Sequence, residues 1–240
     1  MSLLADSFQP STFADAFRFM ADNDGLLWHK TAEQLELSGA ALAVALAIAL
    51  PLGVWLGHLH RGAFLAIAIS NIGRALPSLA VIAIGLAFLG IGFWNVLVAL
   101  VVLAVPPVLT NAYVAVDEVD REVVEAARGM GMRRREILAR IELPLALPLI
   151  FAGARTAAVY VVSTATIAAI AGGGGLGDII VNQASYRLEG VIAAALWVAA
   201  LALAADLLLG LVQRLLTPRG MRPVRAFELD VTSAEVNAPA

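Results

Sequence analysis

A charged stretch at residues 116–144 is the feature that most constrains how this chain can fold. It holds six of the 16 basic residues, whereas the whole chain is 60% hydrophobic and only 15% charged. Long apolar runs flank it on both sides. A segment this polar cannot lie in hydrocarbon, so it must form a loop on one face of a membrane. The sequence therefore predicts an all-α integral membrane protein, because a helix satisfies its own backbone polar groups in lipid.

The apolar runs predict five membrane-spanning helices. At a rise of about 1.5 Å per residue, about 20 residues cover the roughly 30 Å of hydrocarbon. The predicted spans are residues 37–57, 62–92, 93–116, 145–171 and 190–216.

The second predicted span is longer than one crossing needs and contains Arg74 and Pro77. Because proline removes a backbone donor and clashes with the preceding turn, we expect a break near residues 76–78. Arg74 and Pro77 are therefore candidates for a gate or a helix break. The alternative for Arg74 is a side chain that extends to the membrane interface or caps a half-helix.

Polar segments bound the predicted membrane domain at residues 37–216. Residues 1–36 are acidic and predict an N-terminal arm at the outer interface, and residues 217–240 predict a polar tail. The chain has no cysteine, which excludes disulfides, thiolate metal sites and thiol catalysis. The start lacks a basic segment followed by a short apolar core, so no cleaved signal peptide is predicted. No basic face carries interleaved aromatic residues, so nucleic acid is not expected as a partner.

Two histidines follow the first predicted span. His58, His60 and Arg61 form a short polar turn. Histidines two residues apart can bind a metal, but no further ligand stands nearby, and a hydrated turn is the favoured interpretation.

The distribution of basic residues predicts the orientation in the membrane. In a five-span chain, eleven basic residues fall on the side of the charged loop (Arg61, Arg121, Arg128, Arg133, Arg134, Arg135, Arg140, Arg214, Arg219, Arg222 and Arg225), and three fall on the other side (Arg18, Lys30 and Arg187). The positive-inside rule then places the loop, residues 117–144, and the C-terminus in the cytoplasm. The N-terminus is expected outside.

The loop itself predicts two short helices separated by glycine. Asp120 is a plausible N-cap for a helix over residues 121–128, and Gly131 permits the positive φ of a chain reversal. A second short helix is expected over residues 132–142. Ala126 and Ala127 have little bulk, so another surface can approach them closely. We expect an exposed apolar face on the second half of the loop, made by Met130, Met132, Ile137, Leu138 and Ile141.

The loop also carries a family motif. Glu125, Ala126, Ala127, Gly131, Ile141, Leu143 and Pro144 stand at the spacing of the EAA signature, and the chain resembles the permease subunits of ABC importers. The resemblance implies the type I, MetI-like permease fold in the bacterial cytoplasmic (inner) membrane. It implies that the loop docks on a separate ATPase, that a second permease copy or a paralogue completes the pore, and that an extracytoplasmic binding protein delivers the solute.

The nucleotide is not expected on this chain. The chain has no phosphate-binding loop of the G-x-x-x-x-G-K-[ST] type, and the glycine run at residues 172–177 contains no lysine. ATP and Mg²⁺ would therefore bind to the partner ATPase. The chain is expected to hold no cofactor and no metal, and to be a transport subunit rather than an enzyme.

Further runs resemble one branch of the family, the permeases of glycine betaine, carnitine and choline importers. They lie at residues 74–80, 88–92, 106–113 and 142–148, and in the glycine run that ends at Asp178. This resemblance implies an osmoprotectant as the solute. The alternative is an importer of methionine or another amino acid, whose permeases share the glycine run and the arginine-x-x-proline break.

Polar residues inside the predicted spans are candidates for the translocation pathway. They are Ser78, Asn111, Ser163 and Thr164. The alternative for each is a hydrogen bond between helices or back to its own helix. Asp206 is expected to face protein, because a carboxylate at this depth is costly in lipid.

Two other classes of function remain as alternatives. A membrane-embedded enzyme needs a cluster of His, Asp or Glu within the spans, where only Asp206 is clearly found. An ion-coupled secondary transporter needs more intramembrane charges and repeated halves, and neither is seen in the sequence.

Overall fold

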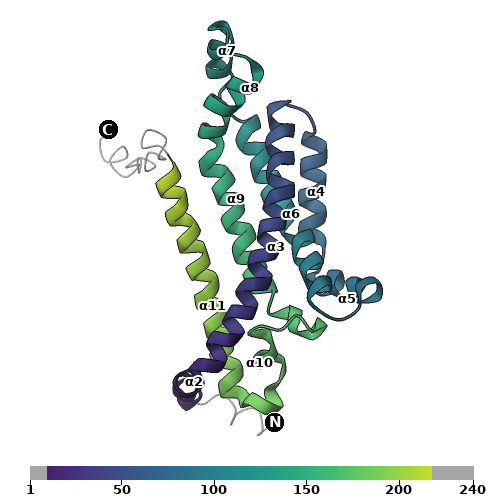
Figure 1. The fold of residues 1–240 in the computed structure, drawn as a ribbon, viewed down its shortest axis with the longest axis vertical. Coiled ribbons are helices and arrows are strands. Elements are labelled where there is room, and N and C mark those ends of the chain that lie inside the picture. Colours follow the sequence, from purple (N-terminus) through teal and green to yellow (C-terminus); the bar gives the residue numbers. More distant parts are fainter. Residues whose placement is uncertain (1–9, 218–240) are drawn as a thin grey trace, which may run out of the picture.

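The computed structural model describes residues 10–217, and this part of the chain contains helices and connecting turns but no strand (Figure 1). The α-helices are α2 (Pro10–Asp22), α3 (Asp24–His58), α4 (Ala63–Ala75), α5 (Ser78–Leu89), α6 (Phe93–Asp117), α7 (Arg121–Gly129), α8 (Arg134–Ile137), α9 (Leu143–Thr164), α10 (Gly177–Val181) and α11 (Gln183–Leu216). A π-helical segment, η1 (Leu138–Glu142), joins α8 to α9, and a 3₁₀ segment, η2 (Ile167–Ala171), follows α9. The predicted tail lies outside the described residues except for Thr217, as does the start of the predicted arm.

Four helical stretches are long and apolar enough to cross a membrane. They are α3, α6, the stretch Arg134–Thr164 that contains α9, and α11. The pair α4 and α5, bent by 92°, adds a fifth if the two helices are counted as one broken span. The predicted all-α membrane fold is therefore confirmed, with four to five candidate spans.

The break in the second span falls where the sequence predicts it. α4 ends at Ala75 and α5 begins at Ser78. Pro77 has an extended ψ of 126°. Because its ring clashes with the preceding turn and it has no N–H to donate, α4 cannot continue through it. As a result α5 lies across one end of the bundle instead of continuing along it (Figure 1).

The first membrane helix starts earlier than the hydropathy pattern predicts. α3 is continuous from Asp24 to His58, so no helix end falls at residue 36. Polar side chains in its first turns are buried and bonded to other elements. Thr31 accepts a hydrogen bond from Trp197 Nε1 at 2.9 Å, and Gln34 Nε2 donates to the carbonyl of Val162 at 2.8 Å. Hydropathy alone assigns the polar start of α3 to an N-terminal arm. These tertiary contacts hold it in the helix bundle instead.

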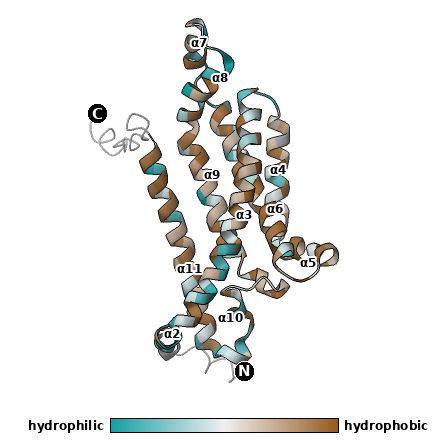
Figure 2. Cartoon of the chain, in the orientation of Figure 1, coloured by the Kyte–Doolittle hydropathy of each residue, from teal (hydrophilic) through white to brown (hydrophobic). Residues whose placement is uncertain are grey.

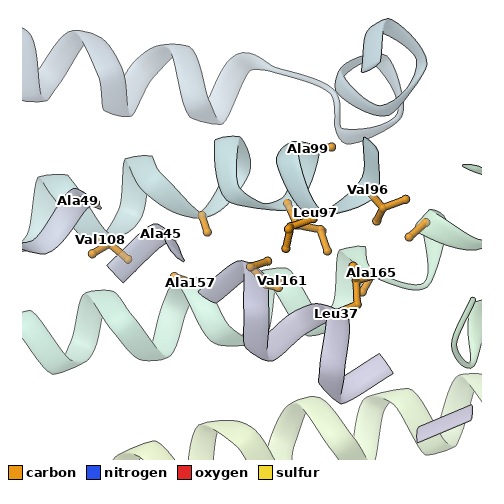
Figure 3. Packing of buried hydrophobic residues seen from close by; sticks show 14 of the residues in the cluster. Leu37, Ala45, Ala49, Val96, Leu97, Ala99, Val108, Ala157, Val161 and Ala165 are labelled. Carbon is orange, nitrogen blue, oxygen red and sulfur yellow. The ribbon is translucent and has the colours of Figure 1, made fainter. Parts of the chain in front are cut away.

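The core forms where α3, α6 and α9 meet. Every fourth residue of α3 from 37 to 57 is buried, and after Leu37 these residues are only alanine or glycine. Figure 3 shows Ala45 and Ala49 facing Val108 of α6, with Val161 of α9 beside Leu37. Small side chains let helix backbones approach closely, which is how packing stabilises helices in lipid.

The two ends of the bundle differ in character. α7, α8 and the turn after α3 lie at one end, with the C-terminal end of α11 toward the same end (Figure 1). α2, α5 and α10 lie at the opposite end. Hydrophilic residues gather on α7 and α8, whereas the long helices are mostly hydrophobic (Figure 2).

Candidate coupling loop and translocation face

The first half of the charged loop has the predicted helix and turn. The Asp120 side chain accepts a hydrogen bond from the Glu122 amide at 2.9 Å and so caps α7. Gly131 has a φ of 86°, and its amide donates to the Arg128 carbonyl at 2.9 Å. The predicted N-cap and the predicted positive φ are both confirmed.

The second half of the loop is not a separate short helix. α8, η1 and α9 follow one another without a break, so the fourth membrane helix effectively begins at Arg134. Leu143 and Pro144 stand in the first turn of α9, directly after the widened π-helical turn. Pro144 has no N–H to donate to the carbonyl of Arg140, which fits a widened turn at this point.

The predicted exposed apolar face is wrong for most of its residues. Ile137 is 2% exposed and packs with Val119, Val124 and Ala127, and Met132 and Ile141 pack against this cluster. Leu138 packs instead against a cluster of α6 and α9 residues. Only Met130 is strongly exposed, at 75%. The apolar residues therefore hold the loop together instead of presenting a docking surface.

The two signature alanines face opposite ways. Ala127 is 1% exposed within the loop's own core, whereas Glu125 and Ala126 are exposed. Exposed charged residues surround them: Arg121, Glu122, Arg128, Arg133, Arg134, Arg135 and Arg140. The surface available to a partner is thus mostly polar, with Ala126 as its small, low-bulk position and with Val123 and Met130 as exposed apolar side chains.

The turn after α3 is exposed, as expected of a hydrated turn, and both histidines also pair with carboxylates of the loop. His58 Nδ1 lies 2.5 Å from Glu142 Oε2, and His60 Nδ1 lies 2.8 Å from Asp117 Oδ1. Glu142 is only 2% exposed. Among the described residues, no group of three or more His, Cys, Asp or Glu side chains could hold a metal ion. These pairings could not be predicted from the sequence, because the partners lie far apart along the chain.

One face of α9 is polar although the helix crosses the membrane. Arg155, Thr156, Tyr160 and Ser163 are spaced so that they share one stripe of the helix, and all are at least partly exposed. The opposite face is buried and apolar, with Ala154, Ala157, Ala158, Val161 and Val162. Two features of the sequence could have revealed this stripe: its helical spacing and its hydroxyl groups.

The exposed surfaces of α3 and α11 have a different composition. The large exposed side chains are Val44, Ile48 and Leu52 on α3, and Leu203, Leu207, Leu208 and Leu211 on α11. Such surfaces suit lipid, whereas charged and hydroxyl side chains at this depth need water or protein around them. The stripe on α9 is therefore the face best suited to an aqueous path or a subunit contact.

An ion pair joins this stripe to α11. Arg155 Nε donates to Asp206 Oδ1 at 2.9 Å, and Arg155 Nη2 donates to Asp206 Oδ2 at 2.7 Å. The two side chains are 34% and 29% exposed. Gln213, farther along α11, donates to the Pro148 carbonyl at 3.1 Å. The expectation that Asp206 faces protein is confirmed, and its partner is on the fourth span.

Two cavities open on the stripe and share Thr156 and Tyr160. The first, of about 410 Å³, is lined by α4, α6 and α9 through Ser70, Gly73, Leu103, Pro106, Pro107, Thr110, Asn111, Thr156 and Tyr160. The second, of about 550 Å³, is lined by Ala152, Arg155, Thr156, Val159, Tyr160, Ser163 and Asp206. Both volumes lie in the range of small-molecule sites, roughly 300–1,000 Å³.

Two of the four predicted pathway residues reach these cavities. Asn111 lines the first cavity, although its Nδ2 also donates to the Pro107 carbonyl at 2.8 Å. Ser163 lines the second and is exposed. Thr164 is 6% exposed, because it lies on the inward face of α9. Ser78 begins α5 and lines neither cavity.

The two gate candidates lie at the break in the second span. Pro77 separates α4 from α5, and Arg74 stands in the last turn of α4, with its side chain outside the described part of the structure.

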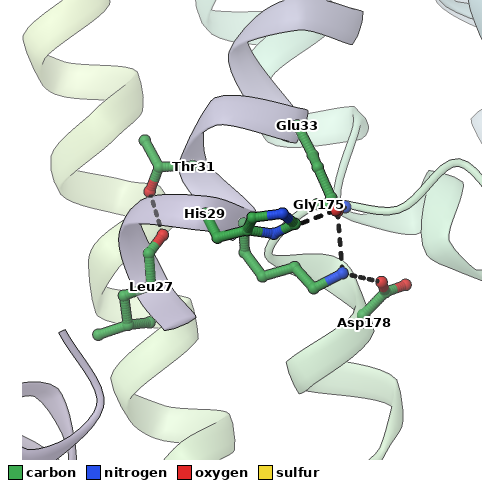
Figure 4. A network of polar contacts seen from close by, with 7 residues as sticks. Leu27, His29, Thr31, Glu33, Gly175 and Asp178 are labelled. Atoms are coloured by element: carbon green, nitrogen blue, oxygen red, sulfur yellow. Dashed lines mark hydrogen bonds and ion pairs between the residues drawn. The ribbon is translucent and has the colours of Figure 1, made fainter. Parts of the chain in front are cut away.

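At the end of the bundle opposite α7, a polar network fixes the glycine run. Lys30 Nζ donates to Glu33 Oε2 at 2.9 Å and to Asp178 Oδ2 at 2.7 Å (Figure 4). The Gly175 amide donates to the same Glu33 oxygen at 2.8 Å. Gly175 has a φ of 82° and lies against Gln34, so the run needs glycine for both conformation and space. The network thus attaches the loop before α10 to the start of α3.

These features describe an all-α protein whose long apolar helices can cross a membrane, with a helical charged loop at one end and a polar stripe on one long helix. The family model described as "binding-protein-dependent transport system inner membrane component" matches residues 49–220. The chain belongs to this family of membrane permease subunits of ABC importers. It is a transport subunit and not an enzyme, and the ATPase of such an importer is a separate subunit.

Curated relatives and solved structures agree with this family. The chain is 38% identical over 208 residues to the glycine betaine/carnitine/choline transport system permease protein OpuCB of Bacillus subtilis, covering 86% of this chain and 96% of the relative. It is 39% identical over 209 residues to the choline transport system permease protein OpuBB of the same organism, covering 87% and 96%. Among solved structures, an inward-facing form of the MetNI methionine ABC transporter is similar, with a TM-score of 0.70 at 24% identity, covering 80% of this chain and 97% of that one.

Proposed function

We propose that this chain is the membrane permease subunit of an ATP-driven importer for quaternary ammonium osmoprotectants such as glycine betaine, choline or carnitine. The observation that carries the proposal is the identity to permeases of that named specificity over nearly the whole chain. The amino-acid alternative has weaker support, because the similarity to the methionine transporter at 24% identity concerns the fold alone.

The proposed importer has three further kinds of subunit. An ATPase binds the outer face of α7 around Glu125 and Ala126, and ATP and Mg²⁺ bind there and not on this chain. A second permease copy or a paralogue completes the pore, and an extracytoplasmic binding protein delivers the solute. The exposure of Glu125 and Ala126 on a loop fixed by its own core supports the first of these assignments.

The proposed orientation is N-terminus outside and C-terminus in the cytoplasm. The eleven-to-three division of basic residues supports it. The clustering of α7, α8 and the turn after α3 at one end of the bundle is compatible with it (Figure 1). The solute then passes along the polar stripe of α9 toward the α7 end.

Uptake by the assembled importer tests this proposal. The permease, its ATPase and its binding protein are reconstituted in liposomes with ATP inside, and uptake of radiolabelled glycine betaine, choline, carnitine and methionine is measured. We expect ATP-dependent uptake of at least one quaternary ammonium solute and none of methionine. Uptake of methionine alone would contradict the proposal and indicate that the chain is part of an amino-acid importer.

A further inference from the structure

The polar stripe of α9 offers two complementary groups for one solute. Tyr160 is the only aromatic residue that lines either of the two cavities described above, and it lines both. The residue is 37% exposed. An aromatic face open to a cavity attracts a quaternary ammonium group, which cannot form hydrogen bonds of its own.

Arg155 offers the second group. A guanidinium has five N–H donors, and within the described residues three hydrogen bonds from Arg155 are formed, two to Asp206 and one to Gln213. Two donors therefore remain for another acceptor beside the second cavity. Because Asp206 already balances the charge, Arg155 does not repel a solute that also carries a cation.

The two groups are spaced for a small zwitterion. Tyr160 follows Arg155 by five residues, which is about 7.5 Å along a helix axis. Both side chains line the second cavity. A solute with a quaternary ammonium at one end and a carboxylate at the other can contact both groups at once.

We propose that Tyr160 and Arg155 form a low-affinity binding site, here called the station, for a zwitterionic quaternary ammonium carboxylate on its way through the permease. The ammonium group lies on the Tyr160 ring, and the carboxylate accepts hydrogen bonds from Arg155. This proposal rests on the proposed function above and names the residues of the path that select the solute. The neutralised Arg155 keeps binding weak, so the solute can leave toward the cytoplasm.

The test measures uptake of two solutes that differ in the carboxylate. Glycine betaine has one and choline does not, and both are supplied to the reconstituted importer. Tyr160→Leu removes the ring and is expected to lower uptake of both solutes about five- to tenfold, while Tyr160→Phe keeps the ring and is expected to lower uptake much less. The double variant Arg155→Met with Asp206→Leu is expected to lower glycine betaine uptake to a similar extent and to lower choline uptake much less.

Controls distinguish solute binding at this station from a purely structural role of Tyr160 and Arg155. Phe64→Leu removes an exposed aromatic ring that lines neither cavity and should leave uptake unchanged. Equal loss of both solutes in the double variant, or loss in Tyr160→Phe as large as in Tyr160→Leu, would overturn the station. So would dissociation of the permease dimer by Tyr160→Leu, because the stripe would then be a subunit interface. If the unmodified importer takes up neither solute, the proposed function fails, and the station fails with it.

Discussion

At the scale of single residues, Gly131 determines whether the charged loop at residues 117–144 can reverse direction. Its φ of 86° is open to glycine and strained for other residues, most of all for a β-branched one. A Cβ would meet nothing within 4 Å, so backbone strain is the whole cost. We expect Gly131→Val to insert in the membrane but to weaken ATPase binding about tenfold, from a strain of about 1–2 kcal/mol.

Gly129 supplies the matched control for this prediction. It also has open space around it, but it lies in α7 without a positive φ, so Gly129→Ala should bind the ATPase normally. The measurement is pull-down of the ATPase, normalised to permease abundance in membranes. Normal pull-down with Gly131→Val would mean that this loop is not the coupling element.

Asp206 is the second residue whose replacement is informative. Asp206→Leu leaves the Arg155 guanidinium without its carboxylate on a helix that is otherwise mostly apolar, whereas Arg155→Met with Asp206→Leu removes both charges. Breaking such a pair is more costly than replacing it by apolar side chains. We expect the single variant to lower the apparent melting temperature of the permease in detergent, and the double variant to restore most of the loss. Equal melting temperatures for the unmodified protein and the single variant would show that the pair does not hold α11 to α9.

At the scale of elements, the small residues of α3 set its distance from α6. A Cβ on Gly53 would lie 2.7 Å from the Leu109 carbonyl oxygen, whereas a Cβ on Gly39 would meet nothing within 4 Å. We expect Gly53→Val to destabilise the permease by about 1–3 kcal/mol, because the two helices must separate. Gly39→Ala, on the same helix, should have almost no effect. Thermal unfolding in detergent compares the two, and equal stability would contradict this account of α3–α6 packing.

At the scale of the whole molecule, the five crossings fix which loops share a side. Reporter fusions after Arg61 and Arg135 are expected to be cytoplasmic, and a fusion after Arg187 extracytoplasmic, because the first two positions lie in the basic segments of the chain. A cytoplasmic reporter after Arg187 would contradict the five-span topology. Such a result would indicate that α4 and α5 do not cross the membrane as one span, since the bend of 92° between them turns the chain across the end of the bundle.

The features that the sequence by itself determined are local in origin. Hydropathy over about 20 residues predicts a span, proline predicts the break at residues 76–78, and a glycine between two predicted short helices predicts a positive φ at Gly131. Each depends on a residue and its near neighbours. The fold class and the first helix and turn of the charged loop were therefore predictable from the sequence.

What only the tertiary structure decided involves residues that are distant along the chain. Arg155 and Asp206 are 51 residues apart, His58 and Glu142 are 84 apart, and Lys30 and Asp178 are 148 apart. Whether Ala127 faces a partner or its own loop, and whether Thr164 faces a cavity or the core, depends on how helices rotate against one another. Hydropathy is an average over a helix and contains no information on that rotation, because every face contributes to it equally. The packing of α9 against α3, α6 and α11 fixes the rotation, and it thereby leaves Tyr160 and Arg155 on the open face.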